Sequence, residues 1–159
     1  MKSFLKSVVF TLCILGFFVF VCLYVTGLSG GGGGGGGATG ISPEAGEKIY
    51  WGDGQCHTCH SIGTSGSATR GPNQEGLAAR AEERAKEAGL SSGLEYLVES
   101  IVNPSAFVVE GYDNIMPKVY DAPIMLDREQ IQAVLTYLQT LGGEPNIEAV
   151  AKFAEKIPE

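Results

Sequence analysis

Two cysteines and a histidine stand close together in the sequence and could hold a cofactor. The segment Cys56-His57-Thr58-Cys59-His60 has the spacing C-x-x-C-H, which is typical of covalent attachment of a c-type haem. Two thiols three positions apart can add to the two vinyl groups of one porphyrin, and the histidine after the second thiol is then held under the iron as an axial ligand. The motif therefore predicts one covalently attached haem c, with Cys56, Cys59 and His60 as its binding residues.

Other chemistries of paired cysteines fit the sequence less well. A structural zinc site takes four ligands, but the other cysteines, Cys13 and Cys22, lie in an apolar segment, and the chain has two histidines, His57 and His60. A thioredoxin-like redox pair needs a βαβ context that the sequence lacks, and a disulfide within the motif would leave its histidine without a purpose. We expect Cys13 and Cys22 to be small apolar residues in lipid, and His57 to be an intervening residue.

Charge and composition limit the possible functions. The 159 residues include 11 basic and 18 acidic side chains, a net charge of −7; beyond Lys2 and Lys6, which precede an apolar segment, nine basic and 18 acidic side chains remain, a net charge of −9. This balance argues against nucleic-acid binding, which normally shows a basic patch. Five of the seven phenylalanines fall within the first 20 residues, so a cofactor could fill part of the interior of the remaining domain.

The segment from Val8 to Leu28 carries no charge, and 17 of its 21 residues are apolar. As a helix it would reach about 31 Å, which is roughly the thickness of the hydrocarbon core of a membrane. Lys2 and Lys6 precede it and no basic residue follows until Lys48, so the positive-inside rule keeps the N-terminus in the cytoplasm. We expect residues 1–7 to be cytoplasmic, residues 8–28 to form one transmembrane helix, and the rest to be exported.

A cleaved signal peptide is the alternative interpretation of this segment. The apolar core of a signal peptide is usually about 7–15 residues, and a small-residue A-x-A site commonly follows it. The segment is longer than that and no such site follows it. Cys22 stands after Val21 rather than after a small residue, which also argues against a lipoprotein cleavage site.

The sequence beyond the apolar segment predicts a linker and an all-α domain. Eight consecutive glycines occupy positions 30–37, and we expect residues 29–40 to be a flexible linker. Capping residues, helical spacing of apolar residues and terminating Gly or Pro residues then indicate helices, the last of them opened by Asp127 and closed by Gly142. The expected helices lie at about 43–51, 77–88, 93–102 and 128–141.

This region resembles the class I monohaem cytochromes c, which are small helical electron carriers with histidine and methionine axial ligands. The motif at 56–60 matches the family's attachment site, and Gly71-Pro72-Asn73 matches the short Gly-Pro segment that follows it. In the family, the proline carbonyl typically accepts a hydrogen bond from the ligand histidine. The resemblance therefore implies that Pro72 orients His60.

The resemblance also implies the second axial ligand. Asn114-Ile115-Met116-Pro117 looks like the family's Met-Pro loop, so Met116 is expected to bind the iron, and a thioether ligand raises the reduction potential. For Met125, nine residues later, we expect a packing role, and Lys118 is a minor alternative ligand. Pro72 and Met116 thus join the two cysteines and His60 as expected cofactor-binding residues, with His60 and Met116 on the metal.

The first and last helices of the domain resemble the family's crossing helix pair. Gly46 and Tyr50 are similar to the glycine and aromatic of its first helix, and Val134 and Tyr137 to the aliphatic–aromatic pair of its last. The cytochrome c domain is expected to span residues 41–143. The C-terminal tail, residues 144–159, has no family counterpart.

The resemblance implies a one-electron carrier rather than an enzyme. With the anchor at 8–28, we expect a protein tethered to a bacterial cytoplasmic membrane, with its haem domain on the periplasmic side, that passes electrons between respiratory or photosynthetic redox partners. Two alternatives stay open. One is the haem c subunit of a larger membrane oxidoreductase complex, and the other is a haem-based gas sensor whose Met116 bond is released by a gas.

Overall fold

The structure is a computed structural model that describes residues 6, 11–21 and 40–158. The chain divides into two compact units, Met1–Gly37 and Ala38–Glu159. In the first unit, residues 11–21 are helical and their side chains are exposed. Among the described residues, no helix has the length and apolar character needed to cross a membrane. The expected anchor at 8–28 lies partly outside the described residues, as does the expected linker, of which the structure describes Gly40.

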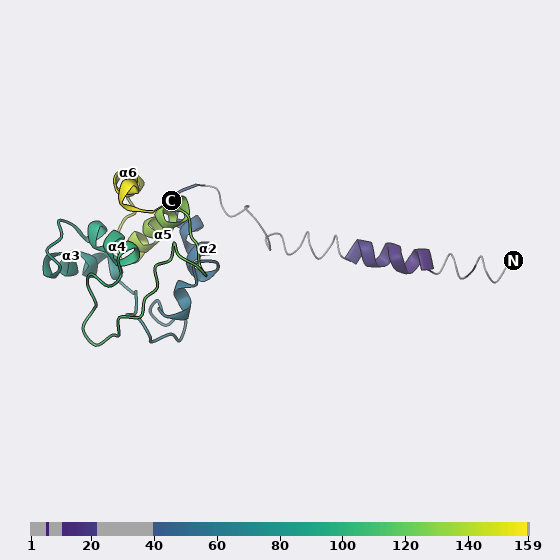
Figure 1. The fold of residues 1–159 in the computed structure, drawn as a ribbon, viewed down its shortest axis with the longest axis horizontal. Helices are drawn as coiled ribbons and strands as arrows, with labels where there is room; N and C mark the ends of the chain where they lie inside the picture. The colour runs from purple at the N-terminus through teal and green to yellow at the C-terminus, as the bar shows by residue number, and fades with distance from the viewer. Residues whose placement is uncertain (1–5, 7–10, 22–39, 159) are drawn as a thin grey trace. The chain divides into compact units, whose positions relative to one another are not determined.

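The second unit is helical, as the capping and spacing signals predict. No strand occurs among its described residues, where Ile62 and Ser65 form an isolated β-bridge. Figure 1 shows the helices of this unit gathered together, with long connections between several of them. In chain order the elements are α2 (Pro43–Trp51), η1 (Cys56–Thr58), α3 (Leu77–Glu87), α4 (Gly93–Val102), α5 (Arg128–Thr140), α6 (Ile147–Lys152) and η2 (Ala154–Lys156).

Local capping explains where the helices begin. The Ser42 side chain accepts a hydrogen bond from the Ala45 N–H at the start of α2, and Pro43 is the first residue of that helix. Asp127 and Gln130 form a reciprocal capping box at α5. At α4, the Ser92 side chain accepts from the Glu95 N–H, but the Glu95 carboxylate accepts from Ser91 rather than from the Ser92 N–H. Only one of the two hydrogen bonds of a capping box is therefore present at α4.

Helices α2 and α5 cross in close contact, and a glycine makes the crossing possible. A Cβ atom on Gly46 would lie 2.0 Å from the Ala133 carbonyl oxygen and 2.7 Å from the Tyr137 Cβ, so no larger residue fits. One turn further along α2, the rings of Tyr50 and Tyr137 meet edge to face with centroids 5.6 Å apart. The crossing helix pair that the resemblance implies is therefore present between α2 and α5.

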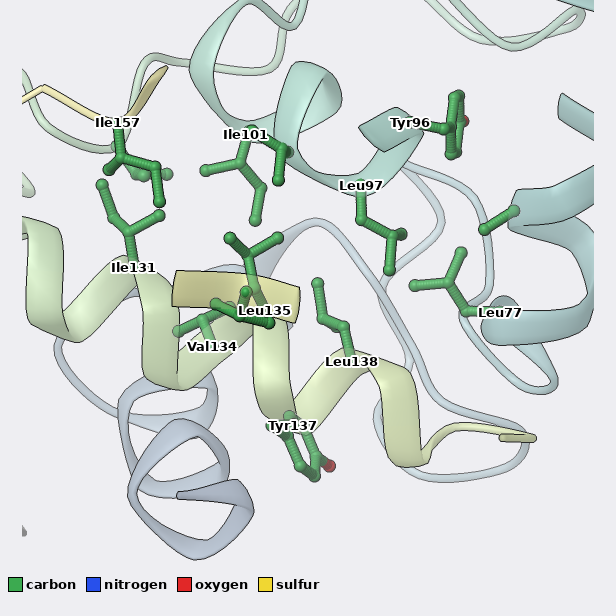
Figure 2. Packing of buried hydrophobic residues seen from close by; sticks show 14 of the residues in the cluster. Leu77, Tyr96, Leu97, Ile101, Ile131, Val134, Leu135, Tyr137, Leu138 and Ile157 are labelled. Carbon is green, nitrogen blue, oxygen red and sulfur yellow. The ribbon is translucent and has the colours of Figure 1, made fainter. Parts of the chain in front are cut away.

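Helix α5 runs through the centre of the core. Its residues from Ile131 to Gln139 are all buried, and Ile131 and Leu135 are completely so. In Figure 2, Leu135 and Leu138 point from α5 toward α4, whereas Tyr137 points to the opposite side of the helix. Burying apolar side chains on more than one side of α5 supplies much of the driving force that holds the unit together.

The C-terminal segment is packed onto the same core. Val150 of α6 and Ile157 after η2 are fully buried, and Ile157 lies beside Ile131 in Figure 2. The Arg128 side chain donates to the Ile157 carbonyl oxygen at 3.0 Å, and Lys156 pairs with Glu95 at 2.7 Å. The expectation that the helix at 128–141 is the last one is therefore wrong, since α6 and η2 follow it and cover the core.

Candidate functional site

A cavity of about 330 Å³ within the second unit gathers the residues that the sequence singled out. Its wall includes Cys56, Cys59, His60, Pro72 and Met116, which come from η1, the loop before α3 and the loop before α5. Much of the remaining wall is apolar and comes from α3, α4 and α5. Examples are Leu77, Leu97, Ile101, Ile131, Val134 and Leu138.

The attachment motif turns tightly so that its thiols and imidazole share one cavity. The Cys59 N–H and the His60 N–H both donate to the Cys56 carbonyl oxygen, at 3.2 and 3.0 Å. Cys56 and Cys59 are not joined in a disulfide, so both sulfur atoms can bond to a porphyrin. Burial raises the pKa of Cys56 to about 11, so before attachment its thiol is protonated at neutral pH.

His60 is held as a neutral imidazole with one nitrogen available. Its Nδ1 lies 2.9 Å from the Pro72 carbonyl oxygen, so the Nδ1–H donates and the Nε2 lone pair is left for a ligand bond. Burial lowers the pKa of His60, which favours this neutral form. A Cβ on Gly71 would lie 2.4 Å from His60 Cε1, so the glycine before Pro72 gives the ring its space.

Asn73 fixes the loop that carries Pro72. Its Oδ1 accepts from the Gly63 and Glu75 N–H groups at 3.0 and 2.9 Å. Its Nδ2 donates to Ser61 Oγ at 3.1 Å and to the Gly63 carbonyl oxygen at 2.8 Å. The sequence suggests no role for Asn73 beyond its place in the Gly-Pro segment, directly after Pro72.

Met116 is half-buried on the cavity wall, in a loop tied to the end of α4. Ser105 and Asn114 share a side-chain hydrogen bond of 3.1 Å, and the Ile115 N–H donates to the Asp113 carbonyl oxygen at 2.9 Å. These contacts shape the segment that presents the methionine. The structure thus brings Met116 and His60 to one cavity, as the expected pair of ligands requires.

The other candidates for the second ligand lie elsewhere. Met125 has a left-handed backbone (φ 55°) and a side chain that is 69% exposed, and it does not belong to the cavity wall. The expectation that Met125 packs in the interior is wrong. Lys118 is also absent from the wall, and its ammonium group lies 5.9 Å from the centre of the Tyr120 ring.

His57 is not a passive spacer within the motif. Its ring lies beside that of Trp51 with centroids 5.7 Å apart, and its Nδ1 is 3.3 Å from the Tyr50 carbonyl oxygen. Tyr50 in turn donates its hydroxyl to the His60 carbonyl oxygen at 3.3 Å. These contacts attach the motif to the end of α2. These contacts are not predictable from the motif alone, because they depend on how the loop at 52–55 places His57 beside α2.

The donor set and the lining suit a covalently bound porphyrin. The cavity offers two free thiols, an imidazole with an available Nε2 and a thioether, all against an apolar wall. Thiols can form the thioether bonds to the porphyrin, imidazole and thioether are known axial ligands of haem iron, and apolar side chains exclude water from the ring.

Comparison with known proteins agrees with this chemistry. A family model described as Cytochrome c matches residues 43–142, a range that includes the motif, the methionine loop and helices α2 to α5. A search of curated proteins found no match to the chain.

Proposed function

Because the chain belongs to the cytochrome c family and carries covalently attached haem c, we propose that it is a membrane-tethered one-electron carrier whose axial ligands are His60 and Met116. Family membership already indicates an electron-transfer haem protein. The ligands, the tether and the direction of electron flow are the parts that we add.

The observation that carries the proposal is the convergence of Cys56, Cys59, His60 and Met116 on one apolar cavity. The bound haem supplies the capacity to take up and release one electron. Cys56 and Cys59 hold the porphyrin, and the Pro72 carbonyl orients His60 through its Nδ1–H. The apolar wall excludes water, so little of the surroundings has to reorganise when the charge changes.

Ligation by two side chains also favours a carrier over an enzyme. If His60 and Met116 both bind the metal, no coordination position remains for a substrate. The cavity wall contains one acidic side chain, Asp113, and one imidazole, His60. The Nδ1–H of His60 is already hydrogen-bonded to the Pro72 carbonyl oxygen. We therefore propose no catalytic residue in this cavity.

We propose that residues 8–28 anchor the protein in a bacterial cytoplasmic membrane, with residues 1–7 in the cytoplasm and residues 29–40 as the linker. The support is the uncharged stretch of 21 residues preceded by Lys2 and Lys6, which by length and flanking charge fits a single span. The haem domain would then face the periplasm. The chain beyond Lys6 has a net charge of −9, which suits redox partners with a basic or apolar docking face.

A redox titration of the purified full-length protein tests the carrier function. We expect one reversible one-electron transition and no binding of carbon monoxide to the reduced protein at neutral pH. Carbon monoxide binding would instead favour the gas sensor. Survival of a stable complex through mild detergent extraction would favour the fixed subunit of an oxidoreductase.

Extraction of membranes with alkaline carbonate tests the tether. We expect the haem-bearing chain to stay in the membrane pellet with an N-terminus at or near Met1. A soluble chain that begins near Leu28 would show that the segment is a cleaved signal peptide, and the protein would then be a free carrier.

A further inference from the structure

The C-terminal segment, residues 144–158, is part of the folded core although it lies beyond the range that the family model matches. Val150 is 0% exposed and Ile157 is 1% exposed, and both belong to the same hydrophobic cluster as residues of α4 and α5. Phe153, which lies between them in the sequence, packs against that cluster. Because buried apolar side chains stabilise a fold, this segment is a structural element of the domain.

The segment is attached near both ends of α5. Near the C-terminal end of that helix, the Asn146 N–H donates to the Gln139 side-chain oxygen at 3.1 Å. At the N-terminal end, the Arg128 side chain donates to the Ile157 carbonyl oxygen at 3.0 Å. Ile131, three residues after Arg128 and so on the same side of the helix, lies beside Ile157 in Figure 2. The segment therefore spans most of the length of α5.

A further contact joins the segment to α4. The Lys156 ammonium pairs with the Glu95 carboxylate at 2.7 Å and lies 5.3 Å from the centre of the Phe153 ring. Glu95 directly precedes Tyr96 and Leu97, which both line the cavity. The segment thus contacts two of the helices that form the cavity wall and connects them to each other.

The start of α5 follows directly after the loop that carries Met116. In this loop the Leu126 N–H donates to the Val119 carbonyl oxygen at 2.9 Å, and both side chains are buried on the cavity wall. One residue separates Leu126 from the first residue of α5. A contact that fixes the first turn of α5 therefore also limits how far the methionine loop can move away from the cavity.

Ile157 can act on the cavity through Ile131. Ile131 is completely buried and lines the cavity, whereas Ile157 lies outside the wall, beside Ile131. Protein interiors are closely packed, so atoms removed from behind a wall leave space into which the wall can move. Ile157 is therefore placed to influence the cavity without contacting a ligand inside it.

We propose that the C-terminal segment holds the start of α5 and the methionine loop against the cavity, with Ile157 as the positioning residue that keeps Met116 bound to the iron. This inference rests on the proposed function, because it requires the haem in the cavity and Met116 as its ligand. In the intact protein the segment limits the loop movements that would let another ligand replace the thioether. Loss of the packing at Ile157 makes those movements more frequent.

The test compares Ile157→Ala with Ile147→Ala in the full-length haem protein. Ile147, the first residue of α6, is 43% exposed, so its variant loses the same atoms from the same segment without opening space in the core. Imidazole added to the ferric protein competes with Met116 for the iron. We expect it to bind about tenfold faster to Ile157→Ala than to the wild type and Ile147→Ala. A factor of ten corresponds to about 1.4 kcal/mol, less than truncation of a buried isoleucine usually costs.

Hydrogen exchange provides a second measurement that does not depend on the iron. In Ile157→Ala we expect the exchange of the Leu126 amide to accelerate more than that of the Tyr50 amide in α2, since local opening affects the methionine loop first. Equal acceleration at both amides, together with imidazole binding at the wild-type rate, would overturn the proposal. The segment would then stabilise the whole domain without positioning Met116.

Ile157→Val keeps the proposal testable if Ile157→Ala does not yield haem protein. This variant removes one carbon atom, and we expect a smaller increase in the rate of imidazole binding. An unchanged rate would reject the positioning role. A wild-type protein without a reversible one-electron transition would reject the proposed function instead, so the two failures can be told apart.

Discussion

The imidazole Nδ1 of His60 lies 2.9 Å from the carbonyl oxygen of Pro72, and Gly71 leaves no side chain between them. A backbone carbonyl of the loop before α3 therefore fixes the tautomer and the orientation of the His60 ring. Asn73, the residue after Pro72, holds that loop through four hydrogen bonds. The orientation and tautomer of His60 therefore depend on the hydrogen bonds of Asn73.

Loss of both motif cysteines should abolish covalent attachment. In Cys56→Ser combined with Cys59→Ser, no thiol remains in the cavity to bond the porphyrin. We expect no haem stain on the protein band after denaturing gel electrophoresis. Cys13→Ser, which leaves the motif intact, serves as the control, and full staining of the double variant would show that attachment occurs elsewhere.

Substitution of Met116 should alter the iron's surroundings, whereas substitution of Met125 should not. Ferric iron bonded to a methionine sulfur shows a weak absorption band near the red end of the visible spectrum. We expect Met116→Ala to remove that band, lower the potential and open the iron to carbon monoxide. Met125 is 69% exposed and off the cavity wall, so Met125→Ala should change none of these. The reverse pattern would move the ligand to Met125.

Removal of the Asn73 side chain should loosen the loop that orients His60. Asn73→Ala eliminates its hydrogen bonds to Ser61, Gly63 and Glu75, and we expect the free energy of unfolding to fall by about 1–3 kcal/mol. A weaker Pro72 bond makes the imidazole a poorer donor, so the reduction potential should rise. Denaturant titration and redox titration measure the two effects. The control Thr64→Ala alters an exposed residue of the same region and should leave both unchanged.

Alanine at Gly46 should destabilise the protein although alanine favours helices. Helix propensity alone predicts a gain of about 1 kcal/mol. The new Cβ would overlap the Ala133 carbonyl oxygen at 2.0 Å, and forcing extra atoms into a packed interface costs about 1–3 kcal/mol or more. Glu47→Ala, at the exposed next position of α2, is the matched control. Chemical denaturation that finds Gly46→Ala more stable than the wild type would contradict the close crossing of α2 and α5.

Acid should weaken the contact between the C-terminal segment and α4. The Lys156 ammonium, with Ser91, lowers the pKa of Glu95 from its ordinary value of 4.5 to about 2. The ionised carboxylate is therefore favoured in the folded state, and its contribution to stability is complete above about pH 4.5 and is lost as the pH falls toward 2. The pair lies at the surface, so the contribution is small and sensitive to salt.

Lys156→Met tests this contact. With the ammonium removed, the pKa of Glu95 in the folded protein rises, and thermal unfolding should depend less on pH between about 4.5 and 2 than in the wild type. Lys152→Met, an exposed position on α6, should keep the wild-type slope. Identical slopes for Lys156→Met and the wild type would show that the ion pair does not contribute in solution.

Most of the helices could be predicted because local signals start and stop them. Ser42 with Pro43 and the Asp127–Gln130 capping box act within four residues of the chain. Helix α6 was missed because it has six residues, too few to show a periodic pattern. Its place depends on burying Val150 and, further on, Ile157 in the core, and most helical stability in proteins comes from such packing rather than from propensity.

The candidate site was predictable where its residues are contiguous and not where folding brings them together. The attachment motif and the methionine loop are short segments that can be read directly. The contacts of His57 with Trp51 and the apolar wall from α3, α4 and α5 arise from loops and separate helices. Met125 was expected to pack because methionine is more often a packing residue than a ligand, but it has a left-handed backbone and an exposed side chain.

The crossing of α2 and α5 has a consequence for the order in which the protein matures. Gly46 and Ala133 come from opposite ends of the haem domain, so their contact forms only after nearly the whole domain has been synthesised. Contacts of such long range close late because a large loop must be ordered first. Until then Cys56 and Cys59 remain accessible, so the haem can be attached covalently before α2 and α5 pack together and enclose it.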